Sequence, residues 1–147
     1  QMDVNFMGMV RYIREVVPIM RAQRHGHIIC LSSIGGLVGL PFQGMYSASK
    51  FAIEGYCEAL RLEIRSFGIN VTTIDPGYSK SLESIEHDET NGLKPEFLAK
   101  KISRIIRKKR PGYHYIIANP LQKLAVVART LLPPRVFAWV MSVYYKV

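Results

Sequence analysis

The sequence is poor in cysteine and contains no long hydrophobic run. Its two cysteines, Cys30 and Cys57, stand far apart and belong to no Cys-x-x-Cys pair, so we expect buried, reduced thiols rather than a disulfide framework. The four histidines are scattered, and the closely spaced ligands that a structural zinc ion requires are absent, so no metal site is predicted. Without eighteen consecutive apolar residues the sequence predicts no membrane-spanning helix, and we expect a cytoplasmic protein.

Acidic residues are also scarce, with 11 Asp and Glu against 20 Lys and Arg, which gives a formal net charge of +9. Such an excess suits anionic partners. Basic residues crowd the segment 100–110, which we interpret first as a solvated helix face and second as a contact with an anionic membrane surface. No nucleic-acid-binding motif accompanies them, so no nucleic acid is expected as a partner. The basic residues of this segment are Lys100, Lys101, Arg104, Arg107, Lys108, Lys109 and Arg110.

The length of 147 residues and the 48% hydrophobic content fit one globular domain. Short apolar runs at 28–31 and 69–74 predict buried strands of a parallel sheet. Apolar residues spaced by about 3.6 predict helices over 2–24 and 44–67. Pro18 is expected to kink the first helix or to mark its last turns. These elements together predict an α/β fold.

The rest of the chain continues the alternation of helix and strand. Proline in a first turn opens a predicted helix near residue 95, with an apolar face opposite the basic residues. Residues 113–118 predict a short strand and residues 121–132 a helix. The stretch 136–145 is strongly apolar and aromatic. We expect it to pack on the core or over a pocket, and the alternatives are a subunit contact and a membrane interface.

Three side chains suited to proton transfer follow the first predicted strand. Ser33 comes just after the apolar run, and active-site groups of open parallel sheets lie beyond the carboxyl ends of the strands. Tyr46 and Lys50 are four residues apart, which places both on one face of a helix. A positive charge beside a phenol favours the ionised phenol, so the pair is suited to moving a proton. A chance pairing on a helix surface is the alternative.

Ser33, Tyr46 and Lys50, with Asn5 upstream, resemble the catalytic set of the short-chain dehydrogenase/reductase family. The similarity runs through HIICLSSIGG, YSASKFAIEGYCEALRLEI and GINVTTIDPGYSKS and into the tail. It implies a partial Rossmann-like, doubly wound parallel sheet and an NAD(P)-dependent oxidoreductase that interconverts an alcohol and a carbonyl. The family pattern makes Tyr46 the proton donor or acceptor, with Ser33 holding the substrate oxygen beside it. Lys50 would bind the cofactor ribose, and Asn5 would support Lys50 through a water.

The Pro-Gly pair after the second predicted strand predicts a turn that begins at Asp75. The same resemblance implies that this turn contacts the nicotinamide end of the cofactor. Members of the family usually have an aliphatic residue where Ser79 stands and a threonine where Ser81 stands, so the second hydroxyl is kept. The polar segment that follows resembles the mobile substrate lid of the family. The implied cofactor-binding residues are Tyr46, Lys50, Pro76, Gly77, Tyr78, Ser79 and Ser81.

We interpret the chain as one partial catalytic domain, 1–147, with a lid and basic helix at 83–110 and a helical tail at 119–147. The glycine-rich phosphate turn of the family occurs nowhere in the sequence. We therefore expect the carboxyl-terminal part of a longer enzyme, inactive by itself. The residues that select the cofactor would lie in the other part, so either NADP or NAD is expected, with NADP favoured.

The helix SKFAIEGYCEALRLEI and the segment LLPPRVFAWV look most like those of family members that act on lipophilic alcohols and ketones. A small lipophilic substrate is therefore expected. The family commonly dimerises through a four-helix interface, which implies a homo-oligomer formed through the predicted helices 2–24 and 44–67. The alternative function is a non-catalytic module for dimerisation or for peripheral contact with a membrane surface.

Overall fold

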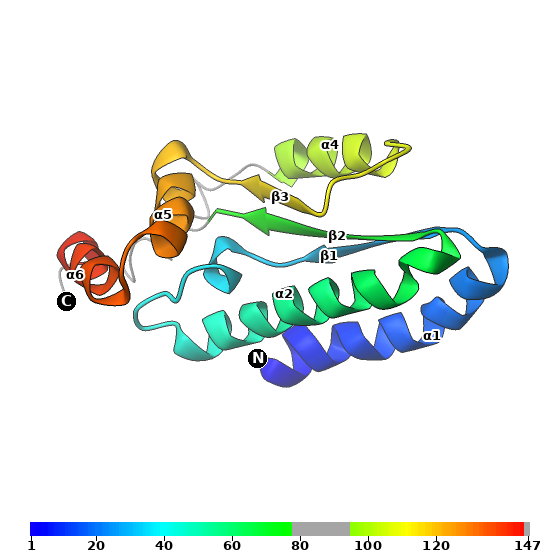
Figure 1. Cartoon of the computed structure of the whole chain (residues 1–147), viewed down its shortest axis with the longest axis horizontal. Helices are drawn as coiled ribbons and strands as arrows, with labels where there is room; N and C mark the ends of the chain where they lie inside the picture. Colours follow the sequence, from blue (N-terminus) through cyan, green and yellow to red (C-terminus); the bar gives the residue numbers. More distant parts are fainter. Residues whose placement is uncertain (78–94, 146–147) are drawn as a thin grey trace.

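The computed structural model describes residues 1–77 and 95–145 and has a three-stranded parallel sheet at its centre (Figure 1). The strand order is β1-β2-β3, with β1 (Gly26–Leu31) and β3 (His114–Ile117) on either side of β2 (Ile69–Pro76). Parallel neighbours require crossover connections, and helices supply them here. The predicted α/β fold with a parallel sheet is confirmed.

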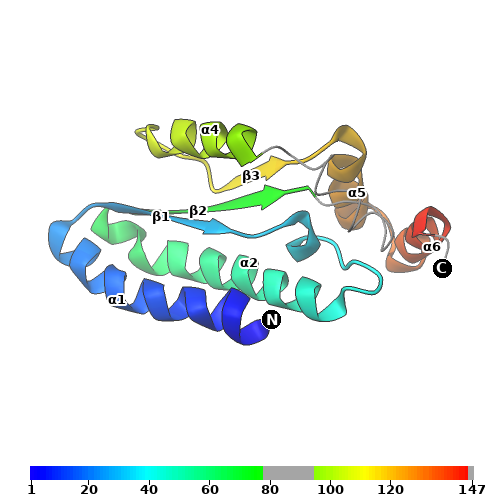
Figure 2. The same ribbon diagram turned by 180° about the vertical axis from the view of Figure 1, so that it is seen from behind.

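Helices cover both faces of this sheet, as in a doubly wound fold. α1 and α2 lie side by side on one face and α4 lies on the other, whereas α5 and α6 lie beyond the carboxyl ends of the strands (Figures 1 and 2). The helical elements are η1 (Met2–Met7), α1 (Gly8–Gln23), η2 (Ile34–Gly36), α2 (Gly44–Ile64), η3 (Arg65–Phe67), α4 (Pro95–Ile106), α5 (Pro120–Leu131) and α6 (Pro134–Tyr145).

The first predicted helix is present as the π-helical turn η1 followed by α1. Pro18 lies within the last turns of α1, as predicted, and the helix continues to Gln23. Arg24 then takes a left-handed conformation with φ of 60°, which stops the helix before β1. The second predicted helix is present as α2 followed by the short η3 turn, and Gly68 ends it at φ of 73°.

The turn expected from Asp75 onwards begins later than the sequence predicts. Asp75 and Pro76 still belong to β2, where they pair with Ile116 and Ile117 of β3. The N–H of Gly77 donates to the carbonyl of Ile117 at 2.8 Å, which extends the pairing by one more residue. A Pro-Gly pair predicts a turn from local preference alone, but the neighbouring strand keeps this stretch extended.

Two apolar clusters hold the layers together. The larger lies between the sheet and the helices α1 and α2 and includes Ile53, Leu60 and both cysteines, which are buried and free as predicted. The smaller joins Ile74 of β2 and Ile117 of β3 to Ile105 of α4. Full burial of an Ile or Leu side chain contributes about 1.5–3 kcal/mol, so these clusters fix the helices against the sheet. Within the described residues no helix is long and apolar enough to cross a membrane.

Candidate active site

Ser33 follows β1 at the carboxyl edge of the sheet and begins the η2 turn. Its Oγ accepts a hydrogen bond from the N–H of Gly35 at 3.1 Å, and the residue is 3% exposed. The turn then presses against α2. A methyl group added at Gly36 would lie 2.8 Å from the backbone oxygen of Lys50, a distance that carbon atoms do not tolerate. Glycine at this position therefore lets the serine turn approach the helix that carries Tyr46 and Lys50.

Tyr46 and Lys50 lie one turn apart near the start of α2. The Lys50 Nζ is 5.7 Å from the centroid of the Tyr46 ring. It donates a hydrogen bond to the carbonyl of Leu31, the last residue of β1, at 3.0 Å. Burial lowers the pKa of Lys50, and the nearby carboxylates of Glu54 and Asp75 act in the opposite direction. The ammonium is thereby held between the sheet edge and the phenol.

The structure brings Ser33 to the same place. A methyl group added at Gly35 would lie 3.1 Å from Cε1 of Tyr46 and 3.5 Å from Oγ of Ser33, so one small space adjoins both side chains. Ser33, Tyr46 and Lys50 therefore converge at the carboxyl end of β1. A serine hydroxyl, a phenol and an ammonium that lie close together can bind a substrate oxygen and move a proton to or from it.

Asn5 lies in η1 and is hydrogen-bonded to α2 near this region. Its Nδ2 donates to Oγ of Ser49 at 3.1 Å, and the Ser49 hydroxyl donates to the backbone carbonyl of Tyr46 at 2.7 Å. Asn5 is thus connected to the start of α2 through Ser49, the neighbour of Lys50. The residue could be chosen from the sequence, but this contact depends on how η1 packs on α2.

The predicted cofactor-binding turn is described only in part. Pro76 and Gly77 lie at the carboxyl end of β2, on the same edge of the sheet as Ser33. Gly77 packs against the side chain of Gln122 in α5 so closely that a methyl group there would collide with its Oε1. Tyr78, Ser79 and Ser81, and the predicted lid at 83–93, lie outside the described residues.

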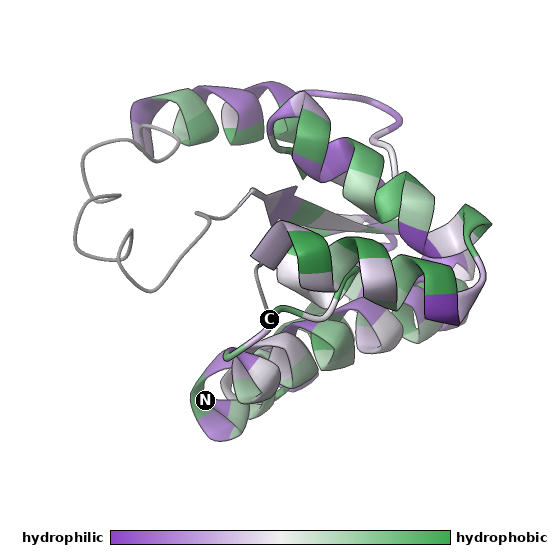
Figure 3. Cartoon of the chain, turned by 90° about the vertical axis from the view of Figure 1, so that its left-hand side faces the viewer, coloured by the Kyte–Doolittle hydropathy of each residue, from purple (hydrophilic) through white to green (hydrophobic). Residues whose placement is uncertain are grey.

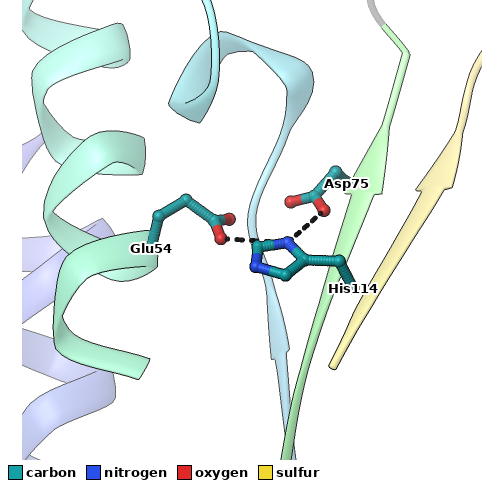
Figure 4. Close-up of side chains that lie close together, drawn as sticks. All are labelled: Glu54, Asp75 and His114. Carbon is teal, nitrogen blue, oxygen red and sulfur yellow. Dashed lines mark hydrogen bonds and ion pairs between the residues drawn. The ribbon is translucent and has the colours of Figure 1, made fainter. Parts of the chain in front are cut away.

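Sequence reasoning missed a cluster of ionisable side chains beside this site. Glu54 of α2, Asp75 of β2 and the first residue of β3, His114, meet between the helix and the sheet (Figure 4). Burial, with a smaller contribution from the neighbouring Asp75, raises the pKa of Glu54 to about 7. The contact with Asp75 raises the pKa of His114. One signal was available, since Glu54 follows Lys50 by four residues and so shares its helix face.

Comparisons with known proteins show which sequences this chain resembles. The 3-ketodihydrosphingosine reductase of Bacteroides thetaiotaomicron is 36% identical over a 172-residue alignment that covers 100% of this chain and 64% of that protein. Retinol dehydrogenase 8 of Bos taurus is 33% identical, over 88% of this chain and 43% of that protein. The chain thus spans less than two thirds of the length of these relatives.

Solved structures with a similar fold also include short-chain dehydrogenases. The crystal structure of a short chain dehydrogenase from Burkholderia cenocepacia, in complex with NADP, matches 96% of this chain and 57% of its own with a TM-score of 0.73 at 21% identity. A family model described as short chain dehydrogenase matches residues 1–91, which include the η2 turn, α2 and β2. Because this match covers more than half of the 147 residues, the chain belongs to the short-chain dehydrogenase/reductase family.

Proposed function

We propose that the chain carries the catalytic residues of an NAD(P)-dependent oxidoreductase that interconverts a lipophilic alcohol and the corresponding carbonyl compound. The observation that supports this most directly is the convergence of Ser33, Tyr46 and Lys50 at the carboxyl edge of the parallel sheet. Family membership supports the same class of reaction.

In the proposed reaction each side chain has one task. The Tyr46 hydroxyl gives a proton to the substrate oxygen during reduction and takes it back during oxidation. The Ser33 hydroxyl donates a hydrogen bond to the same oxygen and so holds the reacting carbon in place. The Lys50 ammonium stabilises negative charge on the phenol oxygen when the proton has left.

The residues present fit the nicotinamide end of a dinucleotide. The Lys50 ammonium carries three N–H donors, and within the described residues one of them is used, by the Leu31 carbonyl. The remaining donors suit the ribose hydroxyls, with the Tyr46 hydroxyl beside them, and Pro76 and Gly77 would adjoin the nicotinamide ring. A bound nicotinamide cofactor supplies or accepts the hydride. NADP is our favoured cofactor because the structural neighbour from Burkholderia was solved with it.

An apolar cavity supports a lipophilic substrate. It has a volume of about 140 Å³ and lies between the η2 turn, α5 and α6, with Ile34, Val38, Leu124, Ala128 and Met141 in its lining. Ile34 directly follows the proposed substrate-binding serine, so an apolar tail in the cavity would leave its polar end near Ser33. The names of the two relatives refer to sphingosine and retinol compounds, which are themselves lipophilic.

The test is a chimaera, because the chain spans only part of its relatives. Residues 1–147 replace the matching part of the Bacteroides reductase, which supplies the remaining part of the fold, and turnover of long-chain ketones is followed by NADPH absorbance. Tyr46→Phe should lower turnover at least about 100-fold, the usual effect of losing an acid–base group, with NADPH affinity changed less than about threefold.

Tyr12→Phe is the matched control, because Tyr12 is a 79% exposed tyrosine on the outer face of α1. It should leave turnover unchanged. If the Tyr46→Phe chimaera turns over at the rate of its parent, the proposed proton transfer is wrong. The chain alone should show no turnover.

We also propose that the chain forms a homodimer and contacts membrane surfaces. The outer faces of α1 and α2 expose Ile19 and Leu62, which supports pairing of these two helices with those of a second copy. At the other end, the helices nearest the viewer in Figure 3 carry hydrophobic turns, with Leu131 and Trp139 largely exposed on α5 and α6. A membrane contact would make vesicle binding increase with anionic lipid and decrease with salt.

A further inference from the structure

The cluster of Glu54, Asp75 and His114 has no role in the proposed reaction. One donor atom from each residue lies within 4.8 Å of the other two. The Nδ1 of His114 is 3.4 Å from Oδ2 of Asp75 and 3.5 Å from Oε2 of Glu54 (Figure 4). Three separate elements, α2, β2 and β3, thus direct nitrogen and oxygen donors to one point between the helix and the sheet.

Several buried oxygen atoms around this point have no hydrogen-bond partner among the described residues. They are Oδ1 of Asp75, both carboxyl oxygens of Glu54 and Oγ of Ser32. The side chain of Asp75 is 0% exposed, and Ser32 is 4% exposed. Ser32 comes from a fourth place in the fold, the end of β1, and lies close enough to lower the pKa of Glu54. Leaving such groups unpaired in the interior costs about 1–3 kcal/mol each, so the cluster has acceptor oxygens that a bound cation would satisfy.

We propose that Glu54, Asp75 and His114 bind a divalent transition-metal ion of the zinc class, through Nδ1 of His114 and one oxygen of each carboxylate. Zinc bonds to nitrogen and oxygen are about 2.0–2.2 Å long, so neighbouring ligands of a tetrahedral site are roughly 3.3–3.6 Å apart. The two distances from Nδ1 of His114 already have this length. Rotation of the flexible Glu54 side chain would bring its oxygen to the same distance from Asp75.

The surroundings suit such an ion in charge and in access. Burial is the main reason why the pKa of Glu54 is raised to about 7. The neighbouring Asp75 contributes, because two carboxylates side by side in the interior do not readily both carry a negative charge. A divalent ion would neutralise both carboxylates and would take the place of a proton on Nδ1 of His114. The Oγ1 of Thr73 is 3.0 Å from Nδ1 of His114, so this hydroxyl would be a fourth oxygen or nitrogen atom close to the bound ion. His114 is 42% exposed in its side chain, which gives the ion a route from solvent.

Binding is tested on the 147-residue chain itself, so the outcome does not depend on enzymatic activity. Chelator-treated protein is titrated with Zn²⁺ by calorimetry and with Co²⁺ by visible absorption. All samples carry His87→Ala, because His87 lies outside the described residues and is a metal ligand by type. We expect one equivalent to bind, with the d–d absorption of Co²⁺ held by nitrogen and oxygen and a higher temperature of unfolding.

His114→Ala and Glu54→Gln should each weaken the binding of Zn²⁺ at least about tenfold, with folding checked by circular dichroism. His27→Ala is the matched control, because His27 also contacts a threonine of β2, Thr72, at 2.9 Å but lies outside the cluster. It should bind the ion as the parent does. Absence of saturable binding would overturn the proposal. Binding that is unchanged in His114→Ala would also overturn it. So would thiolate-to-cobalt absorption, because it would show that the cysteines hold the ion.

Discussion

At the scale of single residues, the site depends on two glycines as much as on the polar side chains. The spacing of Ser33 and Tyr46 can be measured along the sequence, but their proximity requires Gly35 and Gly36, which let the serine turn lie against α2. Alanine at residue 36 would place a carbon atom 2.8 Å from backbone oxygen, which cannot move aside as a flexible side chain can. The glycines of the SSIGG segment are thus part of the architecture that positions the proposed catalytic groups.

His27 makes the stability of the fold depend on pH. Burial lowers its pKa in the folded chain, whereas an unfolded histidine titrates near about 6.5. The folded state therefore binds this proton more weakly than the unfolded state. The contribution of neutral His27 to the free energy of unfolding is complete above the unfolded-state pKa and is lost as pH falls through the folded-state pKa. We expect the free energy of unfolding, measured with urea between about pH 5 and 8, to fall less with acid in His27→Gln than in the parent.

Glutamine is chosen because it retains an N–H donor for the hydroxyl of Thr72, which contacts His27 at 2.9 Å. His25→Gln is the matched control, since His25 is exposed two residues earlier. Both variants retain Glu54 and His114, so the titration of that cluster is the same in each comparison. A parent and a His27→Gln variant with parallel stability profiles would show that His27 has no part in the pH dependence.

At the scale of the elements, periodicity in the sequence predicted the helices and strands well, but long-range pairing moved one boundary. β2 extends through Asp75 and Pro76 because β3 supplies partners that lie some forty residues away. Local turn preference contains no information about such a partner. The extension also explains the buried position of Asp75, which a turn would have exposed to solvent.

Arg61 connects α2 to β2 and to Tyr113, the residue before β3, and its removal should destabilise the chain. It is 8% exposed, its Nε donates to the Val71 carbonyl of β2 at 3.1 Å, and its guanidinium lies 4.5 Å from the ring centroid of Tyr113. Arg61→Met keeps the length of the side chain but leaves the carbonyl without that bond. We expect the free energy of unfolding to fall by about 2 kcal/mol.

Arg65→Met tests the loss of charge alone, because Arg65 is exposed one turn further along the chain. It should change the free energy of unfolding by less than about 0.5 kcal/mol. Urea denaturation measures both variants, and equal stability of the two would contradict the structural role of Arg61.

At the scale of the whole molecule, the proposed dimer predicts that a charged substitution in the interface converts the dimer to a monomer. Leu62 is 67% exposed on α2, on the face that also carries Phe51. Leu62→Glu places a charge where an interface would exclude water, which such interfaces tolerate poorly. Sedimentation of the parent should give a dimer and that of the variant a monomer. Leu121→Glu, at a half-exposed leucine of α5, should remain dimeric, and a monomeric parent would refute the proposed interface.

The sequence by itself determined the fold class, the order of helices and strands, and Ser33, Tyr46 and Lys50 as candidates. Each of these follows from short-range periodicity or from a motif whose residues lie close together in the chain. Tertiary structure alone decided that Asn5 reaches Ser49, that β2 continues through Asp75, and that Glu54, Asp75 and His114 meet. These contacts join residues tens of positions apart, and their distance is set by the packing of helices on the sheet, for which local sequence has no signal.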